Sequence, residues 1–169
     1  MKILIDGRGL KKTGIGRYTE STLREILELD KKNEYLLLIN PEDKKSLKIR
    51  SANLQLIETD VPWFGVKEQT KLLSLINEIK PDLVHFTNFN FPVAYKGKFV
   101  ITIHDLTLLH FRNLRSSVFS KAYYLLKESI MKNVVLKRGI ARACSIIVPT
   151  EYVKEDVSKT FKVRRNKIE

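Results

Sequence analysis

The sequence predicts an α/β domain of the Rossmann-like type, in which a doubly wound, mainly parallel sheet carries helices on both faces. Three observations favour this fold. Short apolar runs alternate with stretches of helical periodicity along the whole chain. The apolar runs are continuous, as in strands that helices cover on both sides. In addition, 43% of the 169 residues are hydrophobic, which is enough to form a substantial core.

Strands are expected where apolar runs meet turn residues. The first strand contains Ile3, Leu4 and Ile5, and the second, a run of leucines after Tyr35, stops at Pro41. The third run is weaker than its neighbours. In order, the predicted strands are 2–6, 34–40, 53–58, 82–87, 98–104 and 145–149.

Helices are expected where apolar residues recur at helical spacing. Leu23, Ile26 and Leu27 mark the first helix, and Pro81 ends the second. Thr150 is placed to cap the last helix, although its segment forms only half of a capping box. In order, the predicted helices are 16–29, 66–80, 116–141 and 151–160.

The composition indicates the cellular compartment and the kinds of partner to expect. Cys144 is the single cysteine, so no disulfide can form within the chain, and the three histidines lack zinc-ligand spacing. We therefore expect a cytoplasmic protein with neither a metal nor a cofactor. The sequence shows no signal peptide and no transmembrane run of about 18 apolar residues. The net charge of +12 favours anionic partners, namely phosphorylated substrates, nucleic acid or an anionic membrane surface.

Glycines gather in the loop between the first strand and the first helix. Gly7, Gly9, Gly14 and Gly16 lie there among the cations Arg8, Lys11, Lys12 and Arg17. Such a loop lets a ligand approach the main chain, and a helix that begins near Gly16 presents free amides to an anion. We expect contact with a phosphate or a sugar here, with a flexible surface turn as the alternative. The spacing differs from the dinucleotide-binding fingerprint, and no ribose-binding acid follows.

Polar residues also follow two later strands of the predicted sheet. His104 and Asp105 come at the carboxyl end of one strand, where doubly wound sheets bind their ligands. Because neighbouring strand residues point in opposite directions, these two need not form a catalytic pair. Asn88 and Asn90 follow the preceding strand and could bond sugar hydroxyls. The alternatives are a structural histidine and plain loop packing.

The region 112–142 is strongly basic. It holds eight basic residues and one acidic residue, Glu128, with apolar residues in two stripes at helical spacing. One stripe, which includes Phe119 and Tyr123, is expected to cover the sheet. The other is surrounded by cations such as Lys121 and Lys127, and could touch a membrane interface or another domain. A well-solvated helix pair is the alternative.

Four motifs of the chain resemble those of a known enzyme family. They are Asp6-Gly7-Arg8-Gly9-Leu10, Gly14-Ile15-Gly16-Arg17-Tyr18, Thr102-Ile103-His104-Asp105-Leu106 and the segment 145–154. Their order and spacing resemble the N-terminal domain of the family-four (group 1) retaining glycosyltransferases of the B fold, which have two Rossmann-like domains facing across a cleft. The pattern is most similar to the subgroup that includes bacterial mannosyl- and rhamnosyltransferases.

The resemblance implies a domain division. Residues 1–161 would form the N-terminal, acceptor-side domain, and 162–169, which are polar and basic, would begin an interdomain linker. The family's nucleotide-sugar pocket belongs to a C-terminal domain that these 169 residues do not include. We therefore expect this chain alone to be inactive. The segment 109–112 also lacks a proline that is common in the family at that point.

The resemblance also implies roles for individual residues. His104 would be catalytic through contact with the transferred sugar, and Gly14, Ile15 and Gly16 would approach the donor phosphate or sugar. The acceptor-binding residues would be Arg8, Lys11, Thr13, Asn88 and Asp105. The partners would be a nucleotide-sugar donor, a glycan or lipid-linked acceptor and an anionic membrane surface at the inner face of the membrane.

Three function classes follow from these observations. The first is the acceptor-binding half of a glycosyltransferase that moves a sugar such as mannose or rhamnose to a glycan or glycolipid. The second is a basic nucleic-acid-binding module, which the wide spread of cations and the lack of a nucleic-acid motif disfavour. The third is a stand-alone nucleotide-binding Rossmann protein, which the missing fingerprint disfavours.

Overall fold

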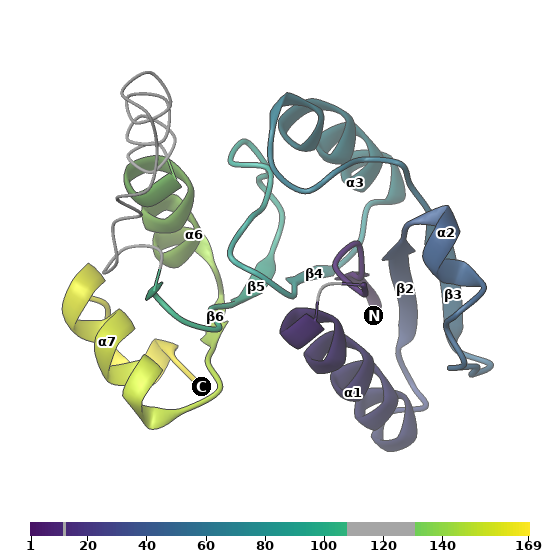
Figure 1. Ribbon diagram of the computed structural model, residues 1–169, viewed down its shortest axis with the longest axis horizontal. Helices are drawn as coiled ribbons and strands as arrows, with labels where there is room; N and C mark the ends of the chain where they lie inside the picture. Colours follow the sequence, from purple (N-terminus) through teal and green to yellow (C-terminus); the bar gives the residue numbers. More distant parts are fainter. Residues whose placement is uncertain (12, 108–130) are drawn as a thin grey trace.

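The computed structural model describes residues 1–11, 13–107 and 131–169, and these form an α/β domain around one parallel sheet (Figure 1). The described residues contribute six strands in the order β3-β2-β1-β4-β5-β6. The strands are β1 (Lys2–Asp6), β2 (Glu34–Ile39), β3 (Leu54–Glu58), β4 (Leu83–Phe86), β5 (Phe99–Thr102) and β6 (Ser145–Ile147). This order is that of dinucleotide-binding Rossmann folds, so the predicted doubly wound fold is confirmed.

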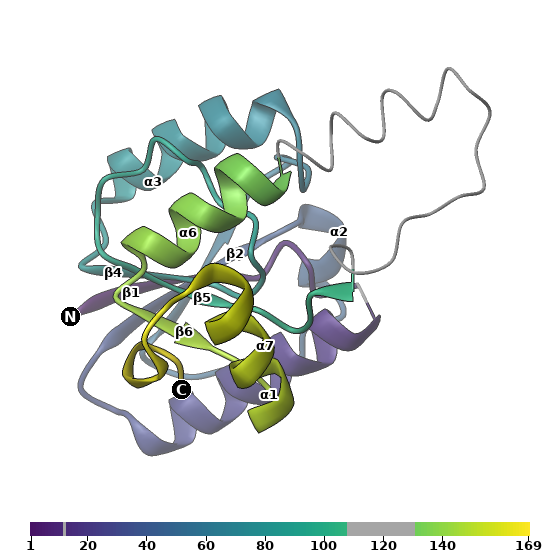
Figure 2. The ribbon, with the colours of Figure 1, turned by 90° about the vertical axis from the view of Figure 1, so that its left-hand side faces the viewer.

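The helices lie on both faces of the sheet. Figure 2 shows α3 (Leu73–Ile79) and α6 (Lys137–Arg142) above it, and α1 (Thr13–Leu29) and α7 (Glu151–Phe161) below it. The short α2 (Pro41–Lys44) follows β2. Two π-helical segments, η1 (Glu68–Leu72) and η2 (Met131–Leu136), run directly into α3 and α6, and η3 (Arg165–Lys167) is a single 3-10 turn.

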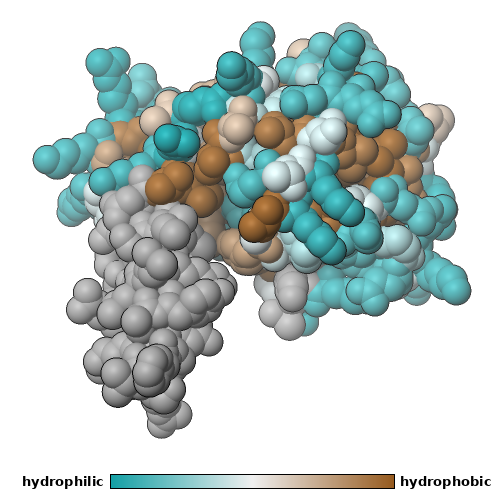
Figure 3. Space-filling model, turned by 90° about the horizontal axis from the view of Figure 1, so that it is seen from above, coloured by the Kyte–Doolittle hydropathy of each residue, from teal (hydrophilic) through white to brown (hydrophobic). Residues whose placement is uncertain are grey.

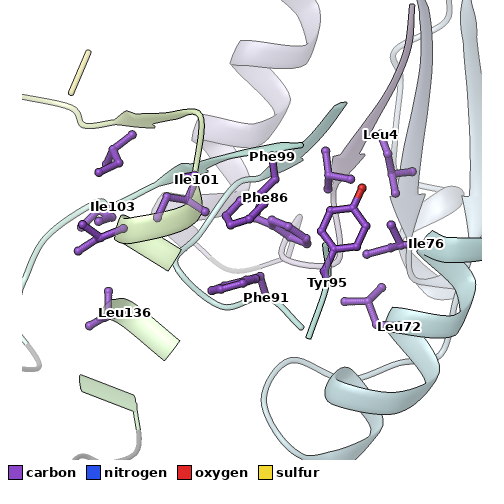
Figure 4. Packing of buried hydrophobic residues seen from close by; sticks show 14 of the residues in the cluster. Leu4, Leu72, Ile76, Phe86, Phe91, Tyr95, Phe99, Ile101, Ile103 and Leu136 are labelled. Atoms are coloured by element: carbon purple, nitrogen blue, oxygen red, sulfur yellow. The ribbon is translucent and has the colours of Figure 1, made fainter. Parts of the chain in front are cut away.

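Alternating side chains of the central strands enter two separate cores. Leu4, Leu36 and Leu38 pack beneath α3 and α6, whereas Ile5 and Leu37 pack against α1. Both sets are almost fully buried, which explains why these strands read as continuous apolar runs in the sequence. The first core contains a group of aromatic rings between the strands and the loop after β4, with Phe86, Phe91, Tyr95 and Phe99 at its centre (Figure 4).

The observed elements differ from the predicted ones mainly at their ends. Helix α1 begins three residues earlier than expected, and five of the six strands are one to three residues shorter. The predicted helix 66–80 is instead a π-helical turn followed by α3. Of the predicted helix 116–141, the part up to residue 130 lies outside the described residues.

Residues 162–169 pack onto the domain. Lys162 ends α7 in a left-handed conformation, and Ile168 then lies parallel to Ile146 of β6 with its side chain 1% exposed. Arg165 pairs with Glu151 and Glu155 of α7. The role of this segment as an interdomain linker stays a prediction.

The last helix begins at the predicted cap. The hydroxyl of Thr150 accepts a hydrogen bond of 3.2 Å from the amide of Val153. We expect Thr150→Ala to lower the free energy of unfolding by about 1 kcal/mol, because one amide at the start of α7 loses its partner. Urea unfolding monitored by circular dichroism would measure the loss, and Thr150→Ser should retain most of the stability. Equal midpoints for the alanine variant and the parent would contradict this role.

Candidate active site

A cleft of about 790 Å³ opens at the carboxyl edge of the sheet. Its walls come from the segments that follow five different strands: Gly14, Ile15, Trp63, Phe64, Asn88, Phe89, His104, Asp105, Thr107 and Pro149. The strand order reverses between β1 and β4, and open α/β sheets bind their ligands at such a point. Five residues predicted from the sequence therefore meet in one cleft, namely Gly14, Ile15, Asn88, His104 and Asp105.

The glycine-rich loop brings the start of α1 to this cleft. A side chain at Gly14 would meet no atom within 4 Å, so the space beside its backbone is open. At Gly16, in contrast, a Cβ atom would lie 1.9 Å from the carbonyl oxygen of Leu10. Gly16 thus allows the loop to pack closely on the helix, and it does not line the cleft itself. The 17-residue helix α1 presents the positive end of its dipole at Gly14 and Ile15.

His104 is held by the backbone of the neighbouring strand end. Its Nε2 atom lies 2.9 Å from the carbonyl oxygen of Thr87, and this oxygen can only accept a hydrogen bond. The proton of the neutral ring is therefore on Nε2, and Nδ1 is left as an acceptor. The ring is half-buried and meets the ring of Tyr18 edge to face, with 5.0 Å between the centroids.

Tyr18 is itself held by Thr102, which also bonds a second histidine that the sequence did not reveal. The Tyr18 hydroxyl lies 3.0 Å from the hydroxyl of Thr102, which lies 2.9 Å from Nε2 of His85. His85 is buried, and this burial lowers its pKa to about 4, so the ring is neutral at pH 7. A neutral, buried side chain at this position supports Tyr18 and, through it, the ring of His104.

Asn88 and Asp105 supply polar groups to the lining of the cleft. Asp105 is exposed, and its Oδ1 atom accepts a hydrogen bond of 2.8 Å from the amide of Thr107. The amide of Asn88 donates to Asn90, which in turn donates to the carboxylate of Glu68. Both side chains are thus oriented by neighbouring groups, an arrangement that suits the recognition of hydroxyl groups.

Arg8 was predicted to bind the acceptor, but its side chain lies in the interior of the domain. Its guanidinium is buried between the carboxylates of Asp6 and Glu68, at 2.7 and 2.9 Å. Burial alone would lower the pKa of Arg8, but the two carboxylates raise it above its ordinary value. The side chain has no exposed surface to offer a ligand. Instead, its Nη1 atom donates to the carbonyls of Val61 and Pro62, which precede the aromatic residues of the cleft.

Lys11, another predicted acceptor residue, lies away from the cleft. Lys11 pairs with Glu42 and Asp43 at the surface. Thr13 begins α1, and its side chain lies outside the part of the chain that the structure describes. Lys11 does not line the cleft, and the roles of Lys11 and Thr13 stay predictions.

Aromatic residues form a wall that the sequence analysis did not predict. Trp63 and Phe64 meet edge to face with centroids 6.3 Å apart, and Phe64 lies 6.0 Å from Phe89. We call these three residues the aromatic wall. The indole ring of Trp63 lies so close to Gly9 that a Cβ atom there would come within 2.1 Å of it. The available signal was the sole tryptophan of the chain, next to a phenylalanine in a loop bounded by Pro62 and Gly65.

Comparison with known protein families finds a match over most of the chain. Residues 14–169 match the model of Glycosyltransferase Family 4. The chain belongs to this family. As a family 4 glycosyltransferase domain, of the N-terminal type, it has a glycosyltransferase role and, in general terms, a nucleotide-sugar donor and an acceptor as partners. This membership favours the first of the three function classes. No curated protein matches the sequence.

The length and the hydropathy of the helices in this glycosyltransferase domain bear on whether they could cross a membrane. No helix within residues 1–11, 13–107 and 131–169 is both long and apolar enough to cross a bilayer. On the face seen in Figure 3, hydrophilic side chains surround patches of hydrophobic ones.

Proposed function

We propose that this domain is the acceptor-side half of a retaining glycosyltransferase that transfers a sugar, such as mannose or rhamnose, from a nucleotide sugar to a glycan or glycolipid. The observation that carries the proposal is the meeting of an open helix N-terminus, a tautomerically fixed histidine and two oriented polar side chains in one cleft. The amide-rich start of α1 suits a diphosphate. His104, Asn88 and Asp105 suit sugar hydroxyls.

The proposed chemistry requires positioning and charge stabilisation. A retaining transfer develops positive charge on the sugar ring and negative charge on the leaving diphosphate. In front-side transfer, the leaving phosphate oxygen takes the proton of the acceptor hydroxyl while the new glycosidic bond forms. His104 then needs only to accept a hydrogen bond from a hydroxyl of the transferred sugar through Nδ1, which fixes the ring beside the acceptor.

The proposal includes a second domain that binds the nucleotide. Residues 1–169 alone are therefore expected to fold but to show no measurable sugar transfer, and to bind free nucleotides more weakly than about 1 mM. The measurement is sugar transfer from a panel of nucleotide sugars, run in parallel on this chain and on the full-length protein. Robust turnover by the 169-residue chain would contradict the two-domain mechanism, and no turnover by the full-length protein on any donor would contradict the function.

The proposal also extends to the place of action. A phosphate-bearing glycolipid acceptor would require the enzyme to work in the cytoplasm, at the inner face of a membrane. The net charge of +12 supports attraction to such an anionic surface. The cations expected to contribute most, including Lys121 and Lys127, lie outside the described residues, so this part of the proposal rests on the sequence alone.

A further inference from the structure

The aromatic wall has no role in the mechanism described so far. Trp63, Phe64 and Phe89 line the same cleft as Asn88 and Asp105, so aromatic side chains and hydrogen-bonding groups border one space. This combination is not the composition of a purely apolar groove. A pyranose ring has the matching chemistry, because one of its faces presents C–H groups and its edge presents hydroxyls.

The backbone at Phe64 indicates that the position of this ring matters. Phe64 has a positive φ of 60°, a strained conformation that residues other than glycine rarely adopt. The side chain nevertheless remains 37% exposed, so this conformation gains no full burial of the ring in return. Strain of this kind at a cleft is typical of residues that bind a ligand.

The wall is also rigidly supported. Arg8, itself held by two buried carboxylates, donates to the carbonyls of Val61 and Pro62 immediately before Trp63. The indole packs directly on the backbone of Gly9. The indole Nε1 atom is buried and has no hydrogen-bond partner among the residues that the structure describes. A preformed aromatic surface of this kind binds a ring without first having to become ordered.

From these observations we infer that the aromatic wall is the subsite for a sugar ring of the acceptor, and that the acceptor is recognised as a glycan rather than through a lipid chain. The sugar ring packs against Phe64 and Phe89, whose planes are inclined by 45°, and its hydroxyls bond Asn88 and Asp105. This inference rests on the proposed function and names the chemical class of its acceptor.

The test uses the full-length protein and three probes, the methyl α-glycosides of mannose, rhamnose and glucose. Saturation-transfer NMR should show contact at the ring protons of at least one glycoside. Phe64→Ala should weaken that binding about fivefold or more, as expected when one aromatic contact is lost. Phe64→Leu, which keeps an apolar side chain but loses the ring, should also weaken it, whereas Phe64→Tyr should retain it. Val66→Ala is the matched control, because Val66 is 78% exposed two residues after Phe64 and does not line the cleft.

The outcomes separate the subsite from the proposed function. Binding of no glycoside, equal binding by Phe64→Ala and the parent, or binding of decyl phosphate in place of the glycosides would each overturn the inference. Sugar transfer by the full-length enzyme to the bound glycoside, with an unchanged KM in Phe64→Ala, would overturn it while leaving the function intact. Glycoside binding that depends on Phe64, without transfer from any donor, would support the subsite and contradict the function.

Discussion

Replacing His104 by alanine in the full-length enzyme is expected to reduce turnover about 100-fold, which corresponds to about 2.7 kcal/mol of transition-state stabilisation. The Nδ1 atom is the acceptor that the Thr87 carbonyl leaves available, and alanine removes it. The transferred sugar would then lose the contact that aligns it with the acceptor hydroxyl. Steady-state transfer measured at saturating donor and acceptor would report this loss directly.

Two further variants separate chemistry from folding. His104→Asn keeps a hydrogen-bonding group and should recover part of the activity. Tyr18→Phe removes the hydroxyl that bonds Thr102 but keeps the ring against His104, so its turnover should fall much less. Turnover equal to that of the parent in His104→Ala would remove this residue from the site. Loss of the folded state in the same variant, seen as a lost thermal transition, would assign it a structural role.

Arg8→Ala is expected to lower the free energy of unfolding by about 3–5 kcal/mol. The guanidinium is the buried partner of both Asp6 and Glu68, so its removal leaves two carboxylates in the interior without a counter-charge. The variant also loses the bonds to the Val61 and Pro62 carbonyls that hold the aromatic wall. Chemical denaturation of the 169-residue chain measures the first effect, and the fluorescence of Trp63, its sole tryptophan, measures the second.

Matched controls show whether burial causes this effect. Lys44 forms an ion pair with Glu58 in which both side chains are about half exposed, and Lys44→Ala should change the stability by less than about 1 kcal/mol. Arg8→Lys keeps the charge but lacks the forked geometry that bonds both carboxylates, so its stability should fall between those of Arg8→Ala and the parent. A loss below about 1 kcal/mol in Arg8→Ala would show that the ion pairs contribute little.

The fold was predictable because its signals are local. Each strand is a short apolar run, and each predicted helix shows its own spacing, end or cap, as Thr150 does for α7. The four-residue helix α2 was not predicted. The exact ends of the elements were less predictable, because neighbouring strands set where pairing stops. The turn at Glu68 adopts π-helical geometry, and its carboxylate bonds Arg8, a partner 60 residues away in the sequence.

The site was predictable in part for the same reason. His104, Asn88 and Asp105 directly follow strands, and parallel strands bring their carboxyl ends to one edge. Two residues of the aromatic wall, Trp63 and Phe64, could not be placed in this way, because they reach the cleft through a loop whose path depends on Arg8. The burial of Arg8 could not be predicted either. The sequence shows a cation beside glycines, and nothing near it in the sequence indicates the pairing with Glu68.

The pairing of Ile168 and Glu169 with β6 has a consequence for self-association. The outer edge of a terminal strand offers free amides and carbonyls to any other extended chain. Here the amide of Glu169 donates to the carbonyl of Ile146, and the carbonyl of Glu169 accepts from the amide of Val148. Ile168 and Glu169 therefore cover the outer edge of β6 and keep its backbone groups from pairing with another chain. A version of the domain shortened before Ile168 would expose both the backbone groups and the side chain of Ile146 to strand addition by a second molecule.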